Sequence, residues 1–143
     1  MKQSFTKEIR AFNRFYTNII GLLDRHILDS NYSLPEVRIL YELYHHSGLT
    51  ASDIIALLDI DKGYLSRILR RFEKHKLVNK VTSSTDKRSA SIKLTAKGNK
   101  EFENLDSASN KQIEEVFGNL TESECTALIQ KFTEIQQILN NKK

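Results

Sequence analysis

The chain has 143 residues, a formal net charge of +4, 39% hydrophobic residues, one proline and one cysteine. This length suits one ordinary domain, and a lone cysteine cannot form an intrachain disulfide, so a reducing, cytoplasmic compartment is expected. No apolar run is long enough to cross a bilayer, and the N-terminal segment MKQSFTKEIR lacks the apolar stretch of a signal peptide, so no membrane partner is expected.

The basic residues are concentrated in the middle of the chain. Residues 61–100 contain twelve Lys or Arg and three Asp or Glu, a net charge of +9, whereas the remaining residues carry a net charge of −5. A basic surface of this kind attracts the phosphates of nucleic acids. The alternative, a solvated basic surface without a partner, is less favoured because the cluster coincides with structural motifs.

A long amphipathic helix is predicted over residues 5–28. Its apolar residues recur at steps of three and four: Phe5, Ile9, Phe12, Tyr16, Ile19, Leu23 and Ile27. A second helix is expected to begin at Ser33, because Ser33 and Glu36 have the spacing of a capping box and Pro35 suits the first turn. Gly48 is expected to end this helix.

Residues 50–74 have the pattern of two short helices joined by a tight turn. Thr50 and Asp53 form another helix-start signature, and Asp61 can cap the second of the two helices. Leu65, Ile68, Leu69 and Phe72 share one face of that helix, and Gly63, Arg67, Arg70 and Lys74 share the opposite face. The arrangement is typical of a helix-turn-helix.

After Leu77 the periodicity changes from that of a helix to that of strands. Residues 78–83 and 90–94 are short strand candidates, and the letters STDKRS between them supply a polar turn. A hairpin beside a helix-turn-helix is a wing, which is expected here over about residues 78–95.

Two further helices are predicted, over residues 96–117 and from a capping box at residues 121–124 onward. The apolar stripes of the first and last helices are wide, so we expect these helices to pack together and against a second copy; a purely intramolecular bundle is the alternative. The expected fold is mainly α with a small β-hairpin wing, in a single domain over residues 1–143. A winged helix-turn-helix over residues 33–98 is flanked by dimerisation helices over residues 5–30 and 99–141.

The stretch LTASDIIALLDIDKGYLSRILRRFEKHKLV, followed by TDKRSASIKLTAKG, resembles the MarR family of winged helix-turn-helix transcription regulators. Two motifs carry the resemblance, D-x-R at residues 86–88 and L-T-x-x-G at residues 94–98. The order of the other elements also fits, so the resemblance covers nearly the whole chain. One departure is His75–Lys76, where the family often has a glycine, and little functional consequence is expected from it.

The resemblance implies a homodimer that binds a pseudo-palindromic double-stranded DNA with one recognition helix and one wing per subunit. It implies that Arg67 contacts DNA, that Arg88 enters the minor groove and that Asp86 orients the wing. The physical chemistry of arginine agrees, because a guanidinium binds guanine bidentately in the major groove and is attracted to a narrow A·T-rich minor groove.

Other candidate DNA contacts lie near these residues. The recognition helix offers Lys62, Gly63, Tyr64, Ser66, Arg70 and Arg71, and the wing adds Lys87. Thr50 and Ser52 could present hydroxyl and N–H groups to a phosphate at the start of the preceding helix. For Arg71 and Lys74 a solvated helix surface is an equal alternative.

Other kinds of site receive less support. Tyr16, His26, Tyr41 and Tyr44 are candidates for an effector pocket, since family members often bind aromatic acids in this region, although aromatic residues at helical spacing are more often core. Adjacent His45 and His46 point about 100° apart on a helix, so no metal site and no cofactor are expected. A lone cysteine such as Cys125 is more often a small buried apolar residue than a redox sensor.

The motifs of common enzymes, such as G-x-S-x-G and H-E-x-x-H, are absent from the sequence, so no enzyme is expected. The prediction is a cytoplasmic, homodimeric, sequence-specific DNA-binding regulator of transcription, a repressor released by a small-molecule or other effector. The alternatives are a non-specific architectural DNA-binding protein of the same fold and a sensor or interaction module without an operator.

Overall fold

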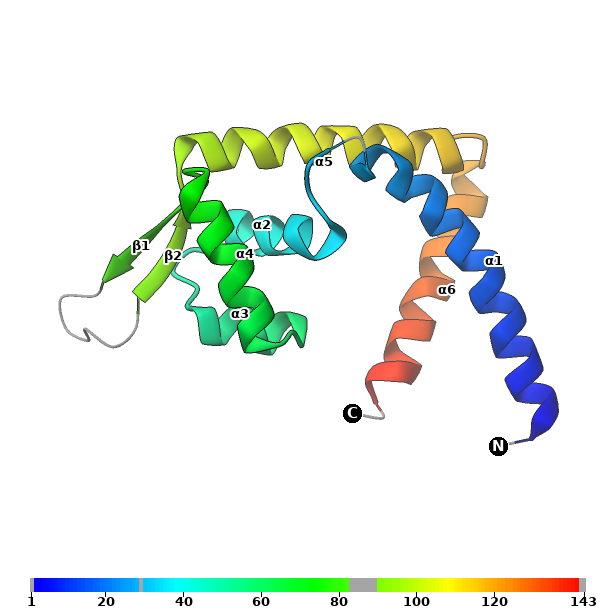
Figure 1. Cartoon of the computed structure of the whole chain (residues 1–143). Helices are drawn as coiled ribbons and strands as arrows, with labels where there is room; N and C mark the ends of the chain where they lie inside the picture. Colours follow the sequence, from blue (N-terminus) through cyan, green and yellow to red (C-terminus); the bar gives the residue numbers. More distant parts are fainter. Residues whose placement is uncertain (1, 29, 83–89, 142–143) are drawn as a thin grey trace. The chain divides into compact units, whose positions relative to one another are not determined.

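The computed structural model describes residues 2–28, 30–82 and 90–141, without the side chains of residues 20 and 22–28. These residues form α1 (Gln3–Leu28), α2 (Leu34–His45), α3 (Ala51–Leu58), α4 (Lys62–Lys74), β1 (Val78–Thr82), β2 (Ala90–Leu94), α5 (Ala96–Phe117) and α6 (Glu122–Asn140) (Figure 1). The predicted fold, mainly α with a small hairpin, is confirmed. The element boundaries agree with the predicted ranges to within the usual uncertainty of helix ends.

Contacts within the chain divide it into two compact units. One unit comprises residues 24–109 and contains α2, α3, α4, the hairpin and the first part of α5. The other comprises residues 1–23 and 110–143, and it contains most of α1, the end of α5 and α6.

Polar caps determine where several helices begin. At α3, the Asp53 carboxylate accepts hydrogen bonds from the N–H and the hydroxyl of Thr50 at 2.8 and 2.7 Å, and Thr50 Oγ1 accepts one from the N–H of Asp53. Thr121 and Glu124 make the same reciprocal contacts at α6. These boxes satisfy N–H groups that a helix start leaves unpaired, and the hydrogen bonds from Thr50 and Thr121 lower the pKa of Asp53 and Glu124.

The hydrophobic core lies in the unit of residues 24–109. Its buried members are Ile39, Leu40, Leu43, Ile54, Leu58, Leu65, Ile68, Leu69, Phe72, Leu77, Val78, Ile92, Phe102 and Leu105. These residues come from α2, α3, α4, the hairpin and α5. The shared core holds α3 and α4 together as a helix-turn-helix. The face of α4 that carries Leu65, Ile68 and Phe72 is therefore inside, as its periodicity predicts, and the opposite face is left for solvent.

The hairpin is joined to the start of α3 by a further strand-like contact. β1 and β2 pair antiparallel, with Val78 opposite Leu94 and Lys80 opposite Ile92. Beyond this pair, the N–H of Ile92 donates to the carbonyl of Leu49 at 2.7 Å, and Thr50 forms an isolated bridge with Ser91. The root of the wing is thus fixed to the residues that immediately precede α3.

The unit of residues 1–23 and 110–143 carries large apolar side chains on its surface. Within the residues described there, Gln112 alone is buried, and no hydrophobic side chain is. Ile9, Phe12 and Phe15 of α1 and Ile138 of α6 are 46–62% exposed. The unit therefore has no enclosed core of its own among the residues described.

Contacts between aromatic rings join α1 to α6 in this unit. The ring of Tyr16 stacks on Phe12, with centroids 5.6 Å apart, and lies 5.9 Å from the ring of Phe132.

In the described part of the chain, no helix combines the length and the apolar character that a membrane span requires.

Candidate nucleic-acid interface

Helix α4 is closed at its N-terminus by Asp61 and at its C-terminus by a left-handed residue. The Asp61 carboxylate accepts a hydrogen bond from the N–H of Tyr64 at 2.8 Å. At the other end Lys76 has φ 58°, and this conformation turns the N–H of Leu77 back to the carbonyl of Phe72 at 2.8 Å. Lys76 stands where glycine is frequent in the family that the sequence resembles, so here a lysine adopts a conformation that is unstrained for glycine.

The L-T-x-x-G motif holds the same end of α4. Thr95 Oγ1 donates to the carbonyl of Lys76 at 2.7 Å, and Lys97 Nζ donates to the carbonyl of His75 at 3.0 Å. Gly98 is needed because a Cβ atom at this position would lie 2.1 Å from the carbonyl oxygen of Leu77. The motif therefore joins the start of α5 to the end of α4 by hydrogen bonds and close packing. The sequence alone did not predict this role.

The exposed face of α4 carries the predicted DNA contacts. Lys62, Gly63, Ser66, Arg67 and Arg70 are all exposed, and Tyr64 is half-buried. The Arg67 guanidinium carbon lies 5.8 Å from the centroid of the Tyr64 ring, within the range of a cation–π contact. Stacking of this kind restricts the arginine, so that less conformational freedom is lost when its guanidinium binds a partner.

A cleft of about 310 Å³ lies beside this face, between α3, α4 and β1. Polar side chains at its edge include Ser52, Lys62, Ser66, Arg70 and Lys80. Ser52, predicted as a phosphate contact, is exposed there. Thr50, predicted with it, uses its hydroxyl within the capping box with Asp53, whose negative charge also stands at the start of α3.

The wing is fastened to α4 by an ion pair. Lys80 Nζ of β1 lies 2.8 Å from a carboxylate oxygen of Glu73 near the end of α4, and both side chains are at least partly exposed. Lys80 was not among the predicted site residues. Asp86, Lys87 and Arg88, the predicted residues of the wing tip, lie outside the described residues.

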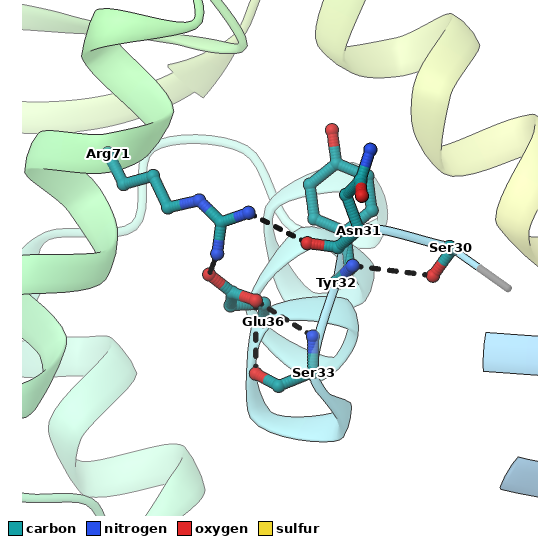
Figure 2. A network of polar contacts seen from close by, with 6 residues as sticks. All are labelled: Ser30, Asn31, Tyr32, Ser33, Glu36 and Arg71. Carbon is teal, nitrogen blue, oxygen red and sulfur yellow. Dashed lines mark hydrogen bonds and ion pairs between the residues drawn. The ribbon is translucent and has the colours of Figure 1, made fainter. Parts of the chain in front are cut away.

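Arg71 differs from the other cations of α4 because its guanidinium has partners on another segment. Its Nη1 lies 2.6 Å from Oε1 of Glu36, and its Nη2 donates to the carbonyl of Asn31 at 2.7 Å (Figure 2). Among the described residues, neither Arg67 nor Arg70 has an acidic group within 4.0 Å. The sequence pattern alone does not separate these arginines, since Glu36 is 35 residues from Arg71.

The candidate effector residues fall in different parts of the chain. Tyr41 and Tyr44 lie on α2, where the rings of Tyr41 and His45 stack with centroids 4.1 Å apart, and Tyr44 and Phe102 lie 4.5 Å apart. The Tyr44 hydroxyl donates to Glu103 at 3.1 Å, and this carboxylate raises the pKa of Tyr44. Tyr16 belongs to the other unit, and the side chain of His26 is outside the described residues.

The remaining candidates for chemistry are the metal-ligating side chains and Cys125. Across the described residues, no group of three or more His, Cys, Asp or Glu side chains is placed to hold a metal ion. Cys125, on α6, is partly exposed and has a free thiol.

The core, the capped α4 and the adjoining hairpin define a winged helix-turn-helix protein. Residues 30–89 match the sequence model of the MarR family. The HTH-type transcriptional regulator MgrA of Staphylococcus aureus is 28% identical over 102 residues, which are 71% of this chain and 65% of MgrA. The chain is thus similar in sequence to transcription regulators of the MarR family over its winged helix-turn-helix region. The matched part spans just under two thirds of the length of this curated relative.

Solved structures share the fold. A MarR mutant from E. coli has a TM-score of 0.76 at 21% identity, with 89% of this chain and 94% of that chain covered. The same mutant complexed with operator DNA has a TM-score of 0.73 at 22% identity, with 90% and 95% covered. Bordetella bronchiseptica BpsR, whose DNA binding is regulated by 6-hydroxynicotinic acid, has a TM-score of 0.72 at 19% identity, with 89% and 91% covered.

Proposed function

We propose that this protein is a cytoplasmic, homodimeric, sequence-specific regulator that binds a pseudo-palindromic double-stranded DNA and acts as a repressor released by an effector. The observation that carries the proposal is the exposed basic face of α4. Arg67 and Arg70 project from a helix whose other face is buried in the core and whose ends are both capped. A rigid helix with free guanidinium groups suits direct contact with base edges in the major groove.

The contacts are assigned by their place around this face. Arg67 is the candidate base contact, because the Tyr64 ring restrains its guanidinium. The candidates for phosphate or base contacts are Lys62, Gly63, Tyr64, Ser66, Arg70 and Ser52. Thr50 joins them only when its N–H and hydroxyl, which both donate to Asp53, are released. At the wing, Arg88 and Lys87 are assigned to DNA and Asp86 to orienting the wing, as the family resemblance implies.

Dimerisation is proposed from the apolar side chains that residues 1–23 and 110–143 leave exposed. Phe5, Ile9 and Phe12 are 46–56% exposed on α1, and Ile129 and Leu139 are each 64% exposed on α6. Covering such surface removes apolar area from water, at roughly 25 cal/mol per Å². A second copy that contributes the same helices provides this cover with two-fold symmetry.

Aromatic side chains on α2 are the candidate contacts for the effector. BpsR is regulated by a small aromatic acid, and the aromatic side chains of Tyr41 and Tyr44 on α2 are partly exposed here. A ligand that shifts the spacing of the two recognition helices from one turn of DNA, about 34–36 Å, would release the operator.

Selection of duplexes from a random pool at physiological salt tests the proposed function. The expected result is an enriched inverted repeat with half-sites about one turn apart. Retention of duplexes without a consensus would replace the proposal with a non-specific architectural role, and no retention at all would favour a sensor or interaction module. The Kd for the selected duplex and for a scrambled one, each measured at two salt concentrations, separates base recognition from phosphate attraction.

A further inference from the structure

The Glu36 carboxylate connects the start of α2 to α4. Its side chain is 6% exposed. One oxygen accepts hydrogen bonds from the N–H and the hydroxyl of Ser33, at 2.8 and 3.0 Å, and the other oxygen faces Arg71 at 2.6 Å. Both oxygens of this buried carboxylate therefore have partners, which is the condition under which a buried charge is stable.

Arg71 in turn connects α4 to the segment that precedes α2. Figure 2 shows its guanidinium between the Glu36 carboxylate and the Asn31 carbonyl, with one nitrogen directed at each. Next to Asn31, the ring of Tyr32 packs edge-on against Phe72 of α4, with centroids 6.4 Å apart. Residues 31–33 thus contact α4 directly through the Asn31 carbonyl and the Tyr32 ring, and indirectly through the Glu36 carboxylate that is bound to Ser33.

We propose that Arg71 is a positioning residue, which holds α4 against residues 31–33 through Glu36 and Asn31 and does not bind DNA phosphate. The proposal rests on the function proposed above, in which α4 is the recognition helix. A guanidinium that donates to two partners at once fixes both the distance and the rotation of the helix that carries it. Residues 31–33 follow α1 in the chain, so the orientation of the recognition helix is tied to this segment.

Glu36 makes the proposal testable. We call the contacts of Arg71 with Glu36 and Asn31 the clamp. The clamp and a phosphate contact predict opposite effects when the Glu36 carboxylate is neutralised. Glu36→Gln removes a negative charge close to α4. If Arg71 binds phosphate, this variant frees Arg71 and strengthens DNA binding. If Arg71 is a clamp, the same variant weakens binding to the selected duplex by about tenfold, the scale of coupling within one hydrogen-bonded network.

The experiment measures Kd against salt concentration for wild type, Glu36→Gln, Arg71→Ala, Arg71→Lys and the double variant Glu36→Gln/Arg71→Ala. Arg70→Ala, which removes an adjacent exposed arginine, is the matched comparison. The clamp predicts that Arg71→Ala leaves the slope of log K against log salt unchanged, that Arg71→Lys does not restore affinity, and that the double variant is no weaker than the weaker single variant. Arg70→Ala is expected to reduce the slope by about 0.9, as loss of one phosphate contact does.

A slope reduced by about 0.9 in Arg71→Ala, or tighter binding by Glu36→Gln, would overturn the clamp. Thermal unfolding of each variant identifies any that fails to fold, and the conservative Arg71→Lys and Glu36→Gln variants then carry the comparison. If wild type retains no duplex, the proposed function fails and the clamp is tested by itself through urea unfolding. Additive losses of stability in the double variant would overturn the clamp, and non-additive losses would support it.

Discussion

Gly98, at the start of α5, lies directly against the backbone carbonyl of Leu77, which follows the end of α4. A Cβ atom at position 98 would stand 2.1 Å from that oxygen and 3.1 Å from the Leu94 side chain. The obstructing atom is backbone, so it cannot move aside as a flexible side chain can. This close approach brings α5, the hairpin and the end of α4 to one junction.

Gly98→Ala is therefore expected to destabilise the protein by about 1–3 kcal/mol, the range for overpacking a closely packed site. Urea unfolding measures the change. Gly21→Ala is the matched control, because a Cβ at position 21 meets nothing within 4 Å, and alanine in the interior of α1 is expected to stabilise by about 0.5–1 kcal/mol. Equal effects of the two substitutions would show that the contact at Leu77 is unimportant.

Lys76→Gly is expected to stabilise the protein, since Lys76 occupies the left-handed region at φ 58°. Relief of this conformation contributes about 1 kcal/mol, part of which is offset by the greater freedom of glycine in the unfolded chain. The control is Lys100→Gly, at an exposed position within α5, which is expected to cost about 1 kcal/mol. A loss of stability in Lys76→Gly, measured by the same unfolding curves, contradicts the expectation.

Arg67→Ala is expected to weaken binding to a selected duplex by about 1–3 kcal/mol and to weaken binding to random DNA less, because a bidentate base contact discriminates between sequences. Fluorescence anisotropy on both duplexes at one salt concentration provides the measurement. Lys131→Ala removes one positive charge from α6, where Lys131 pairs with Glu134, and is expected to leave both affinities unchanged. Equal losses on the two duplexes would reduce Arg67 to a phosphate contact.

Ile9→Glu is expected to disrupt the dimer, since Ile9 is 52% exposed on the apolar side of α1. Burying an unpaired carboxylate in an apolar interface costs several kcal/mol, so the dimer Kd should rise by about 100-fold or more. Sedimentation equilibrium measures this constant. Asn18→Glu adds the same charge to an exposed position on the opposite side of α1, and this variant should remain dimeric; a wild-type protein that sediments as a monomer would remove the proposal of a homodimer.

Stability should fall at high pH because of Tyr32. Burial, together with the charge and hydrogen bonding of Glu101, raises its pKa from 10.0 to about 12. Below pH 10 the hydroxyl is protonated in both states, whereas between pH 10 and pH 12 the unfolded chain releases this proton and the folded chain keeps it. The free energy of unfolding of wild type is therefore expected to decrease across this window relative to that of Tyr32→Phe. Parallel pH curves for the two proteins would contradict the assignment.

Local sequence pattern by itself determined the helices and most of their boundaries. The alternation of Leu65, Ile68 and Phe72 with exposed basic residues follows the helical repeat, and the Thr50–Asp53 and Thr121–Glu124 boxes form between residues three apart. Such features depend on interactions within one or two turns, so they can be read before the chain is folded. The helix-turn-helix and the basic face of α4 were predicted from these local features.

Contacts between residues distant in sequence were decided by the tertiary structure. Arg71 and Arg70 are adjacent basic residues of one helix, yet of the two only Arg71 pairs with Glu36, because its direction around α4 brings it to the start of α2. The backbone hydrogen bond from Ile92 to Leu49 and the close approach of Gly98 to Leu77 also join residues that are distant in sequence. Each depends on how separate elements pack, and a period or a cap within one element contains no information about the partner it will meet.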